Sequence, residues 1–183
     1  MKILYPGEYS ARLKSFPLLT DIMIPLLKKT KGLELVFACR IFSSKELKIE
    51  KKIINLASQN GIGKKCVFLN YVKDISKLIK NSDLIIFPAE QMRGKFDIPL
   101  VLIESLMLGK IVLVSDINPL EEIYKYDKGL SKELVIPNKI ELWQDKIKKA
   151  LKMDRKSDMI KYFQKNFSFD AKKIKNLINF INE

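Results

Sequence analysis

The chain contains no histidine, and its 183 residues include only two cysteines, Cys39 and Cys66. Histidine is the commonest side chain for general acid–base work near neutral pH, so any such chemistry must use other groups. Each cysteine lies in a hydrophobic, strand-like run with no Cys or His nearby to complete a zinc site. We therefore interpret both cysteines as small core residues and predict no metal site.

Two glycine-rich phosphate-binding motifs are also missing, because neither G-x-G-x-x-G nor G-x-x-x-x-G-K-[ST] occurs. Their absence argues against a nicotinamide cofactor and against P-loop chemistry. No apolar run approaches the roughly 20 residues that cross a bilayer, and the apolar part of the N-terminus is too short for a signal peptide. We expect a cytoplasmic protein.

Acidic residues are few relative to basic ones, since 21 Asp and Glu face 34 Lys and Arg and leave a net charge of +13. Such a surplus favours an anionic partner: nucleic acid, a membrane surface or a phosphate-bearing substrate. The lysines are spread over nearly every segment, which is equally typical of a solvated basic surface. No aromatic RNA-binding box or compact helix-turn-helix signal accompanies them, so we do not expect nucleic acid. Peripheral association with the inner membrane face stays an alternative.

Short apolar strands alternate with helical patterns along the chain. The sequence predicts strands at 2–6, 33–39, 65–70, 83–89, 111–115 and 133–137. Helices are expected between them, with one after Pro99 that ends at Gly109. A lysine-rich helical tail is expected over about 138–183, with apolar positions recurring at Leu142, Ile147, Leu151, Ile174, Leu177, Ile178 and Ile181. The central strands are apolar throughout, which predicts a parallel sheet covered on both faces. The expected fold is one α/β domain, residues 1–183, with a doubly wound, Rossmann-like sheet of about six strands.

Ligands of such sheets bind beyond the carboxyl ends of the strands, so the loops there carry the candidate site. The first loop offers Gly7 for a close turn, with Arg12 and Lys14 just ahead of a helix as cations that could grip phosphates. A solvated loop is the alternative for both cations. Arg40 follows the second strand, where its guanidinium either faces the crevice or pairs with Glu104.

Glu104 is the lone acid between Pro99 and Leu108 in an otherwise apolar helical stretch. Burying an unpaired carboxylate is costly unless a partner forms hydrogen bonds to it. Either a basic residue elsewhere in the chain neutralises Glu104, or a ligand uses it.

Four segments resemble the nucleotide-binding C-terminal half of retaining glycosyltransferases of family four, enzymes with two Rossmann-like domains in the GT-B arrangement. They are ILYPG at 3–7, SDLIIFPAE at 82–90, GKFDIPLVLIESLMLGKIVLVSDINPLEEI at 94–123 and NFSFDAKKIKNLINFI at 166–181. The resemblance covers nearly the whole chain and is most specific in the third segment. It implies a UDP- or GDP-sugar as donor, no metal or further cofactor, and transfer to an acceptor held by an N-terminal domain or partner subunit.

Carried over from the family, Glu104 is the acid that accepts hydrogen bonds from the ribose hydroxyls of the donor. The first acid of the same motif falls on Phe96, so Asp97, one place further, is the candidate catalytic carboxylate. The resemblance also places Lys95, Phe96 and Ile98 in the donor-binding loop. Because the sugar-facing acid is displaced, a non-catalytic nucleotide-sugar-binding or partner subunit remains an alternative function.

The family has a Gly-Arg pair after the first strand, where this chain has Gly7 followed by Glu8. The lysine that follows this pair in the family is not in register here, which leaves Arg12 or Lys14 as possible replacements. After the second strand, where the family has a glycine-rich turn, this chain has Arg40. The resemblance begins at the donor domain, so we expect the chain to be half of an active cleft. A third alternative, a basic module that binds nucleic acid or a membrane surface, is favoured by the net charge alone.

Overall fold

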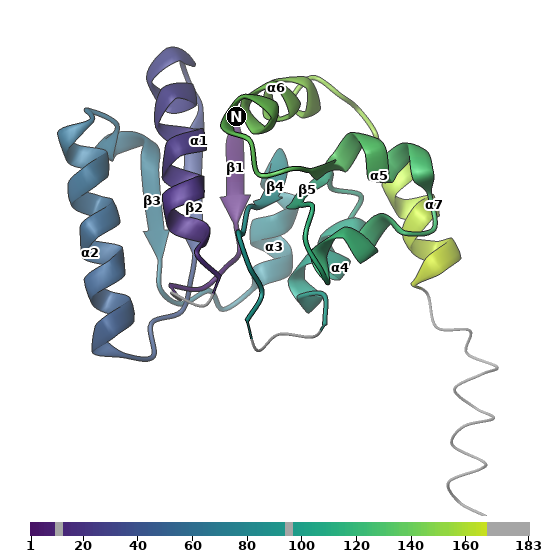
Figure 1. Ribbon diagram of the computed structural model, residues 1–183, viewed down its shortest axis with the longest axis horizontal. Coiled ribbons are helices and arrows are strands. Elements are labelled where there is room, and N and C mark those ends of the chain that lie inside the picture. The colour runs from purple at the N-terminus through teal and green to yellow at the C-terminus, as the bar shows by residue number, and fades with distance from the viewer. Residues whose placement is uncertain (10–12, 94–96, 168–183) are drawn as a thin grey trace, which may run out of the picture.

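The computed structural model describes residues 1–9, 13–93 and 97–167, which form a six-stranded parallel sheet with helices on both faces (Figure 1). The strand order is β3-β2-β1-β4-β5-β6, so the chain winds outward in both directions from the centre. This confirms the predicted doubly wound fold class. The strands are β1 (Lys2–Tyr5), β2 (Glu34–Ala38), β3 (Cys66–Leu69), β4 (Leu84–Phe87), β5 (Val112–Ser115) and β6 (Val135–Ile136).

The central strands read as continuous apolar runs because both of their faces are covered. Every residue of β4 and β5 is buried, and β1 pairs with β2 on one side and with β4 on the other. The order of the strands reverses between β1 and β4, where Leu4 lies opposite Ile85. In a doubly wound sheet this reversal opens a crevice at the carboxyl ends of the strands.

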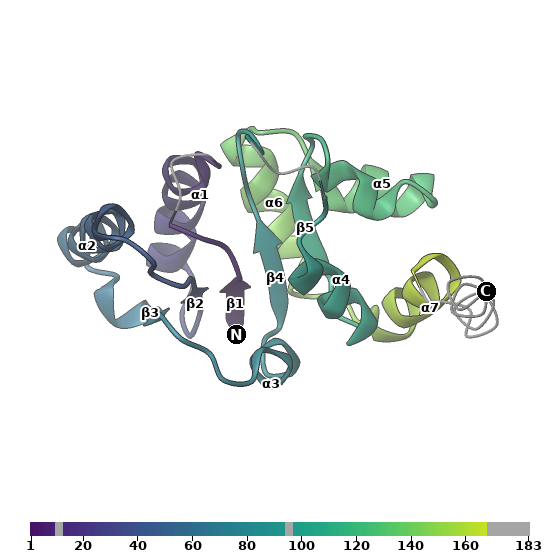
Figure 2. The same cartoon turned by 90° about the horizontal axis from the view of Figure 1, so that it is seen from below.

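Helices α1, α2 and α6 lie on one face of the sheet, and α3, α4 and α7 lie on the other (Figure 2). Within the described residues, no helix is long and apolar enough to cross a membrane. The helices are α1 (Ser15–Lys29), α2 (Ser44–Gln59), α3 (Ile75–Lys80), α4 (Leu100–Met107), α5 (Lys128–Leu134), α6 (Ile140–Ala150) and α7 (Lys156–Asn166), with short 3-10 turns η1 (Gly63–Lys65) and η2 (Leu120–Tyr124).

Local sequence signals set the ends of two long helical segments. Ser43 caps α2, because its side chain accepts a hydrogen bond from the amide of Glu46 while the Glu46 carboxylate bonds back to the amide of Ser43. Gly109 follows α4 with a φ of 74°, a left-handed conformation that glycine adopts without a steric penalty. The predicted end of this helix at Gly109 is therefore confirmed.

The segment before β6 differs from the sequence prediction. We expected a strand over 133–137, but Glu133 and Leu134 belong to α5 and the strand contains only Val135 and Ile136. The Asp127 side chain accepts a hydrogen bond from the amide of Leu130 and so starts this short helix. Two residues suffice for β6 because it pairs with β5 alone at the edge of the sheet.

The predicted helical tail is two helices over the described residues, and its buried face differs from the expected one. Trp143, Ile147 and Ala150 of α6 are buried, whereas Leu142, predicted as a core position, is 41% exposed. Trp143 is buried instead of Leu142, because Trp143 lies four residues before Ile147 and seven before Ala150 and so shares their face of the helix. The predicted apolar positions Ile174, Leu177, Ile178 and Ile181 lie outside the described residues.

Candidate functional site

A pocket of about 280 Å³ opens at the carboxyl ends of β1, β2 and β3. We call it the strand-end pocket. It lies where the sequence placed the candidate site, and helix α4 contributes one residue to its wall. Its lining consists of Pro6, Gly7, Glu8, Ala38, Arg40, Phe42, Leu69, Asn70, Val72, Ile75 and Val101.

Gly7 is required by its close approach to the ring of Tyr5. A Cβ atom at position 7 would lie 2.1 Å from Cζ of Tyr5, which is far inside van der Waals contact. The ring cannot move aside easily, because it is fully buried and packs against Phe16, Phe37 and Phe87. Gly7 therefore lines the strand-end pocket with bare backbone.

Arg40 is exposed and lines the same pocket from the end of β2. An isolated parallel bridge between Glu8 and Arg40 continues the pairing of β1 and β2 beyond the strands and fixes the backbone at Arg40. The neighbouring Cys39 is buried, and this burial is the main cause that raises its thiol pKa to about 12. Cys39 is thus an unreactive core residue, as the sequence predicted, and Arg40 carries the positive charge of this wall.

Glu104 lies on α4, one turn after the pocket residue Val101, and is half-buried. The hydroxyl of Ser76 on α3 donates a hydrogen bond to Oε1 of Glu104. Within the described residues no ion pair reaches Glu104, so Arg40 is not its internal partner. The helix is also more open than its sequence suggests, because Leu100 and Met107 are exposed.

The other predicted site residues are not all brought together. Asp97 is exposed, and Ile98 packs against the core beside the start of α4. Arg12, Lys95 and Phe96 lie outside the described residues.

Lys14 lines a different cavity, an apolar groove of about 460 Å³ between α1 and α2 that we call the α1–α2 groove. It caps α1 in the left-handed conformation, with a φ of 44°, which is uncommon for a residue with a side chain. The groove is walled by side chains such as Phe16, Ile49 and Leu56. The structure therefore separates Lys14 from Gly7 and Arg40, which line the strand-end pocket.

Sequence reasoning missed several contributors to this region. Phe42, Asn70 and Val72 line the strand-end pocket, and the only signal for them was their place in loops that follow predicted strands. Ser115 and Asn138 were missed as well. They lie at the carboxyl ends of β5 and β6 and form hydrogen bonds to Ala89 at the end of β4.

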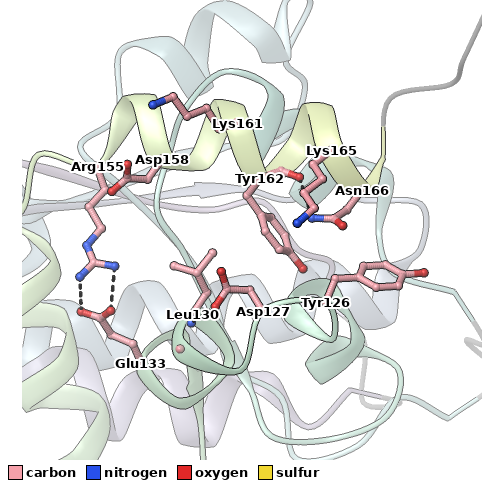
Figure 3. Close-up of a pocket in the computed structure, with 11 residues that line it drawn as sticks. Tyr126, Asp127, Leu130, Glu133, Arg155, Asp158, Lys161, Tyr162, Lys165 and Asn166 are labelled. Carbon is pink, nitrogen blue, oxygen red and sulfur yellow. Dashed lines mark hydrogen bonds and ion pairs between the residues drawn. The ribbon is translucent and has the colours of Figure 1, made fainter.

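A further pocket of about 590 Å³ lies between α5 and α7 (Figure 3). It shares no lining residue with the strand-end pocket. Arg155 and Glu133 form a bidentate ion pair on one side of this α5–α7 pocket. Nη1 of Arg155 lies 2.8 Å from Oε2 of Glu133, and Nη2 lies 3.1 Å from Oε1. Tyr162 bounds it on the other side and donates a hydrogen bond to the carbonyl of Ile123. Among the described residues, no group of three or more Cys, Asp and Glu could hold a metal ion.

Comparisons with solved structures show that other proteins share this fold. The catalytic domain of cholesterol-alpha-glucosyltransferase from Helicobacter pylori superposes with a TM-score of 0.64 at 20% identity, covering 90% of this chain and 97% of that one. A glycosyltransferase from Rickettsia africae ESF-5 gives a TM-score of 0.73 at 18% identity, covering 98% and 46%. The C-terminal domain of a glycosyl transferase group 1 family protein from Francisella tularensis gives 0.55 at 14% identity, covering 84% and 87%.

The TM-scores show a shared fold, and at these identities they show the fold alone. The chain spans less than half the length of the Rickettsia enzyme. No curated protein matches the sequence. A family model described as glycosyl transferases group 1 matches residues 2–167, which is most of the chain. The chain therefore belongs to the glycosyl transferases group 1 family, and it fits the C-terminal domain of such an enzyme.

Proposed function

We propose that the strand-end pocket binds a nucleotide-diphosphate sugar, a UDP- or GDP-sugar, as the donor of a glycosyl transfer. The observation that carries the proposal is the meeting of Gly7, Arg40 and the α4 residue Val101 around one pocket at the carboxyl ends of the strands. Ligands of doubly wound sheets bind beyond the carboxyl ends of the strands. The family match over residues 2–167 supports glycosyl transfer as the reaction class.

Two residues that line the pocket, Arg40 and Gly7, and the nearby Glu104 each have a part in this proposal. The exposed guanidinium of Arg40 is available to the diphosphate, because its planar fork can donate two parallel hydrogen bonds to a pair of phosphate oxygens. Gly7 removes side-chain bulk from the wall beside it. Glu104 has one oxygen bonded to Ser76, and its carboxylate keeps further acceptor capacity for the two ribose hydroxyls.

The chemical step requires stabilisation of the nucleoside diphosphate as it leaves the sugar. Fixed positive charge serves this purpose when it lies where negative charge develops. Arg40 supplies such a charge among the described pocket residues, and Asp97 is the proposed carboxylate near the sugar. Transfer also requires an acceptor held against the donor in a water-excluding cleft, which we assign to an N-terminal domain or partner subunit.

Calorimetric titration with UDP, GDP, ADP, the matching monophosphates and the nucleosides tests the binding proposal. We expect saturable binding that favours one base and requires the diphosphate. Binding that follows only salt concentration and ligand charge, with no preference among bases, would contradict it and favour a general polyanion binder. The runner-up function, a non-catalytic nucleotide-sugar-binding subunit, predicts the same binding but no sugar transfer when an acceptor-binding partner is supplied.

A further inference from the structure

We propose that Ser115 and Asn138 are positioning residues that hold the loop after β4, residues 88–93, at the edge of the donor crevice. The inference rests on the proposed donor-binding function. It concerns residues that line none of the three pockets described above and that were not among the site candidates from the sequence. Their side chains form a closed ring of hydrogen bonds with Ala89, which we call the Ser115–Asn138 clamp.

The ring uses both backbone groups of Ala89. The amide of Ala89 donates to Oγ of Ser115 at 2.8 Å, and the Ser115 hydroxyl donates to Oδ1 of Asn138 at 2.7 Å. The side-chain amide of Asn138 then donates to the carbonyl of Ala89 at 2.9 Å. Ser115 and Ala89 are fully buried, so their polar groups form these hydrogen bonds in place of hydrogen bonds to water.

The clamp joins the ends of three neighbouring strands. Ala89 follows β4, Ser115 ends β5 and Asn138 follows β6. The pairing of β5 with β6 is already made by backbone contacts, including Ser115 opposite Ile136. The side-chain ring is separate from this backbone pairing, and it attaches the loop that leaves β4.

The same loop is anchored on its other side to the segment before α1. The amides of Glu90 and Gln91 both point to the carbonyl of Leu13, at 3.2 Å and 3.4 Å. Leu13 directly precedes α1 and is fully buried. Hydrogen bonds thus tie the loop after β4 to Asn138 on one side and to the segment before α1 on the other, at the switch point between β4 and β1. The strand-end pocket, where the donor is proposed to bind, begins at the end of β1 on the other side of this switch point.

A ring of this kind is sensitive to the loss of one member. Removing the Ser115 hydroxyl leaves the buried amide of Ala89 without its partner and leaves Oδ1 of Asn138 without its donor. The loop would then adopt several arrangements, and a donor would bind only the fraction with the correct one. The expected consequence is weaker nucleotide binding although neither residue contacts the nucleotide.

The test combines Ser115→Ala and Asn138→Asp with hydrogen exchange and nucleotide titration on the full chain. The second variant lies at an exposed position, keeps the acceptor for Ser115 and replaces the donor to Ala89 with a carboxylate oxygen. Its added charge also acts on an anionic ligand, so its hydrogen exchange at Ala89 is the result that keeps the test usable if Ser115→Ala folds poorly. Ser115→Thr retains the hydroxyl and serves as the rescue. Ser82→Ala is the matched control, because Ser82 is also buried but its hydroxyl donates to the carbonyl of Leu78, four residues before it.

We expect the exchange rate of the Ala89 amide to rise at least tenfold in Ser115→Ala, as a loss of about 1.4 kcal/mol would produce. The Ile85 amide, bonded to the backbone of Ile111, should stay as protected as in the parent. The dissociation constant for the preferred nucleoside diphosphate should rise about tenfold, and Ser115→Thr should restore both values.

Two results would overturn the clamp. Equal exchange at Ala89 in Ser115→Ala and Ser82→Ala would show that the ring does not hold the loop. Faster exchange at Ala89 with unchanged nucleotide affinity would show that the loop has no part in donor binding. A parent chain that binds no nucleotide at all would instead contradict the proposed function, and exchange at Ala89, which needs no ligand, keeps the two failures distinguishable.

Discussion

The hydroxyl of Ser76 donates a hydrogen bond to Oε1 of Glu104 and so joins α3 to α4 beside the strand-end pocket. This contact satisfies part of the Glu104 carboxylate without a cation. Glu104 is half-buried, and its carboxylate can accept further hydrogen bonds, for which a ligand hydroxyl is a suitable donor. The pairing explains how one acid is accommodated in a helix that is otherwise apolar.

Glu104→Gln should keep the fold and weaken nucleotide-sugar binding. The amide replaces one of two acceptor oxygens with a donor, and a hydrogen bond to a charged group is worth about 1.5–3 kcal/mol. The dissociation constant measured by calorimetry should therefore rise on the order of ten- to a hundredfold. Ser76→Ala is the companion variant, because it removes the internal partner but leaves the carboxylate. Parental affinity in Glu104→Gln would make the ribose role of Glu104 wrong.

Arg40→Ala should lower affinity for a nucleoside diphosphate more than affinity for the nucleoside, because a cation acts mainly on phosphate charge. The sequence predicts the same role for Lys14, but the position of Lys14 in the α1–α2 groove predicts a smaller effect for Lys14→Ala. Titration of the nucleoside diphosphate and the nucleoside into both variants shows how much each cation contributes to affinity. Lys29→Ala, an exposed lysine at the far end of α1, controls for net charge. Equal losses for nucleoside and diphosphate in Arg40→Ala would indicate a damaged fold instead.

Gly7→Ala should destabilise the protein by about 1–3 kcal/mol, the usual cost of overpacking. The new methyl group would occupy the space of the buried Tyr5 ring, 2.1 Å from Cζ. Thermal unfolding should show a lower midpoint than in the parent. Gly63→Ala is a suitable control, since a Cβ there meets nothing nearer than 3.8 Å. An unchanged midpoint in Gly7→Ala would mean that the close approach to Tyr5 is not constraining.

Cys39 should react with a thiol reagent more slowly than Cys66 in the native protein at pH 8. Burial raises the pKa of Cys39 to about 12 and that of Cys66 to about 11, so neither is a thiolate, and Cys66 is the more accessible. Because both pKa values are raised above the unfolded value, these groups lower stability as the pH rises from about 9 towards 12. Time-resolved labelling with mass spectrometry gives the order, and faster labelling of Cys39 would refute its burial.

The fold could be predicted from the sequence because its signals are local. Apolar runs such as those at β4 and β5 and the stop at Gly109 need only neighbouring residues to be interpreted. The short helix α5 was missed because its sequence, KGLSKEL, has a glycine at its second position and too few turns to show a period. Likewise, the choice between Leu142 and Trp143 as the buried residue depends on what α6 packs against.

The candidate site was only partly predictable, for a related reason. Gly7, Arg40 and the helix of Glu104 follow strands whose ends can be placed from the sequence, and parallel strands bring those ends together. The direction of Lys14 depends on one left-handed residue at the start of α1, which its sequence does not indicate. The Ser115–Asn138 clamp joins residues 23 and 49 positions apart through side chains, and no local pattern predicts such a contact.

The most direct test of donor binding at the carboxyl ends of the strands is a map of nuclear magnetic resonance shifts during titration with the preferred nucleoside diphosphate. We predict that the saturating shifts fall on Gly7, Arg40, Asn70 and Val72 of the strand-end pocket. The α5–α7 pocket serves as the internal alternative, since two lysines, Lys161 and Lys165, line it. Saturating shifts centred on Tyr126, Lys161 and Lys165, with Gly7 and Arg40 unmoved, would contradict the account.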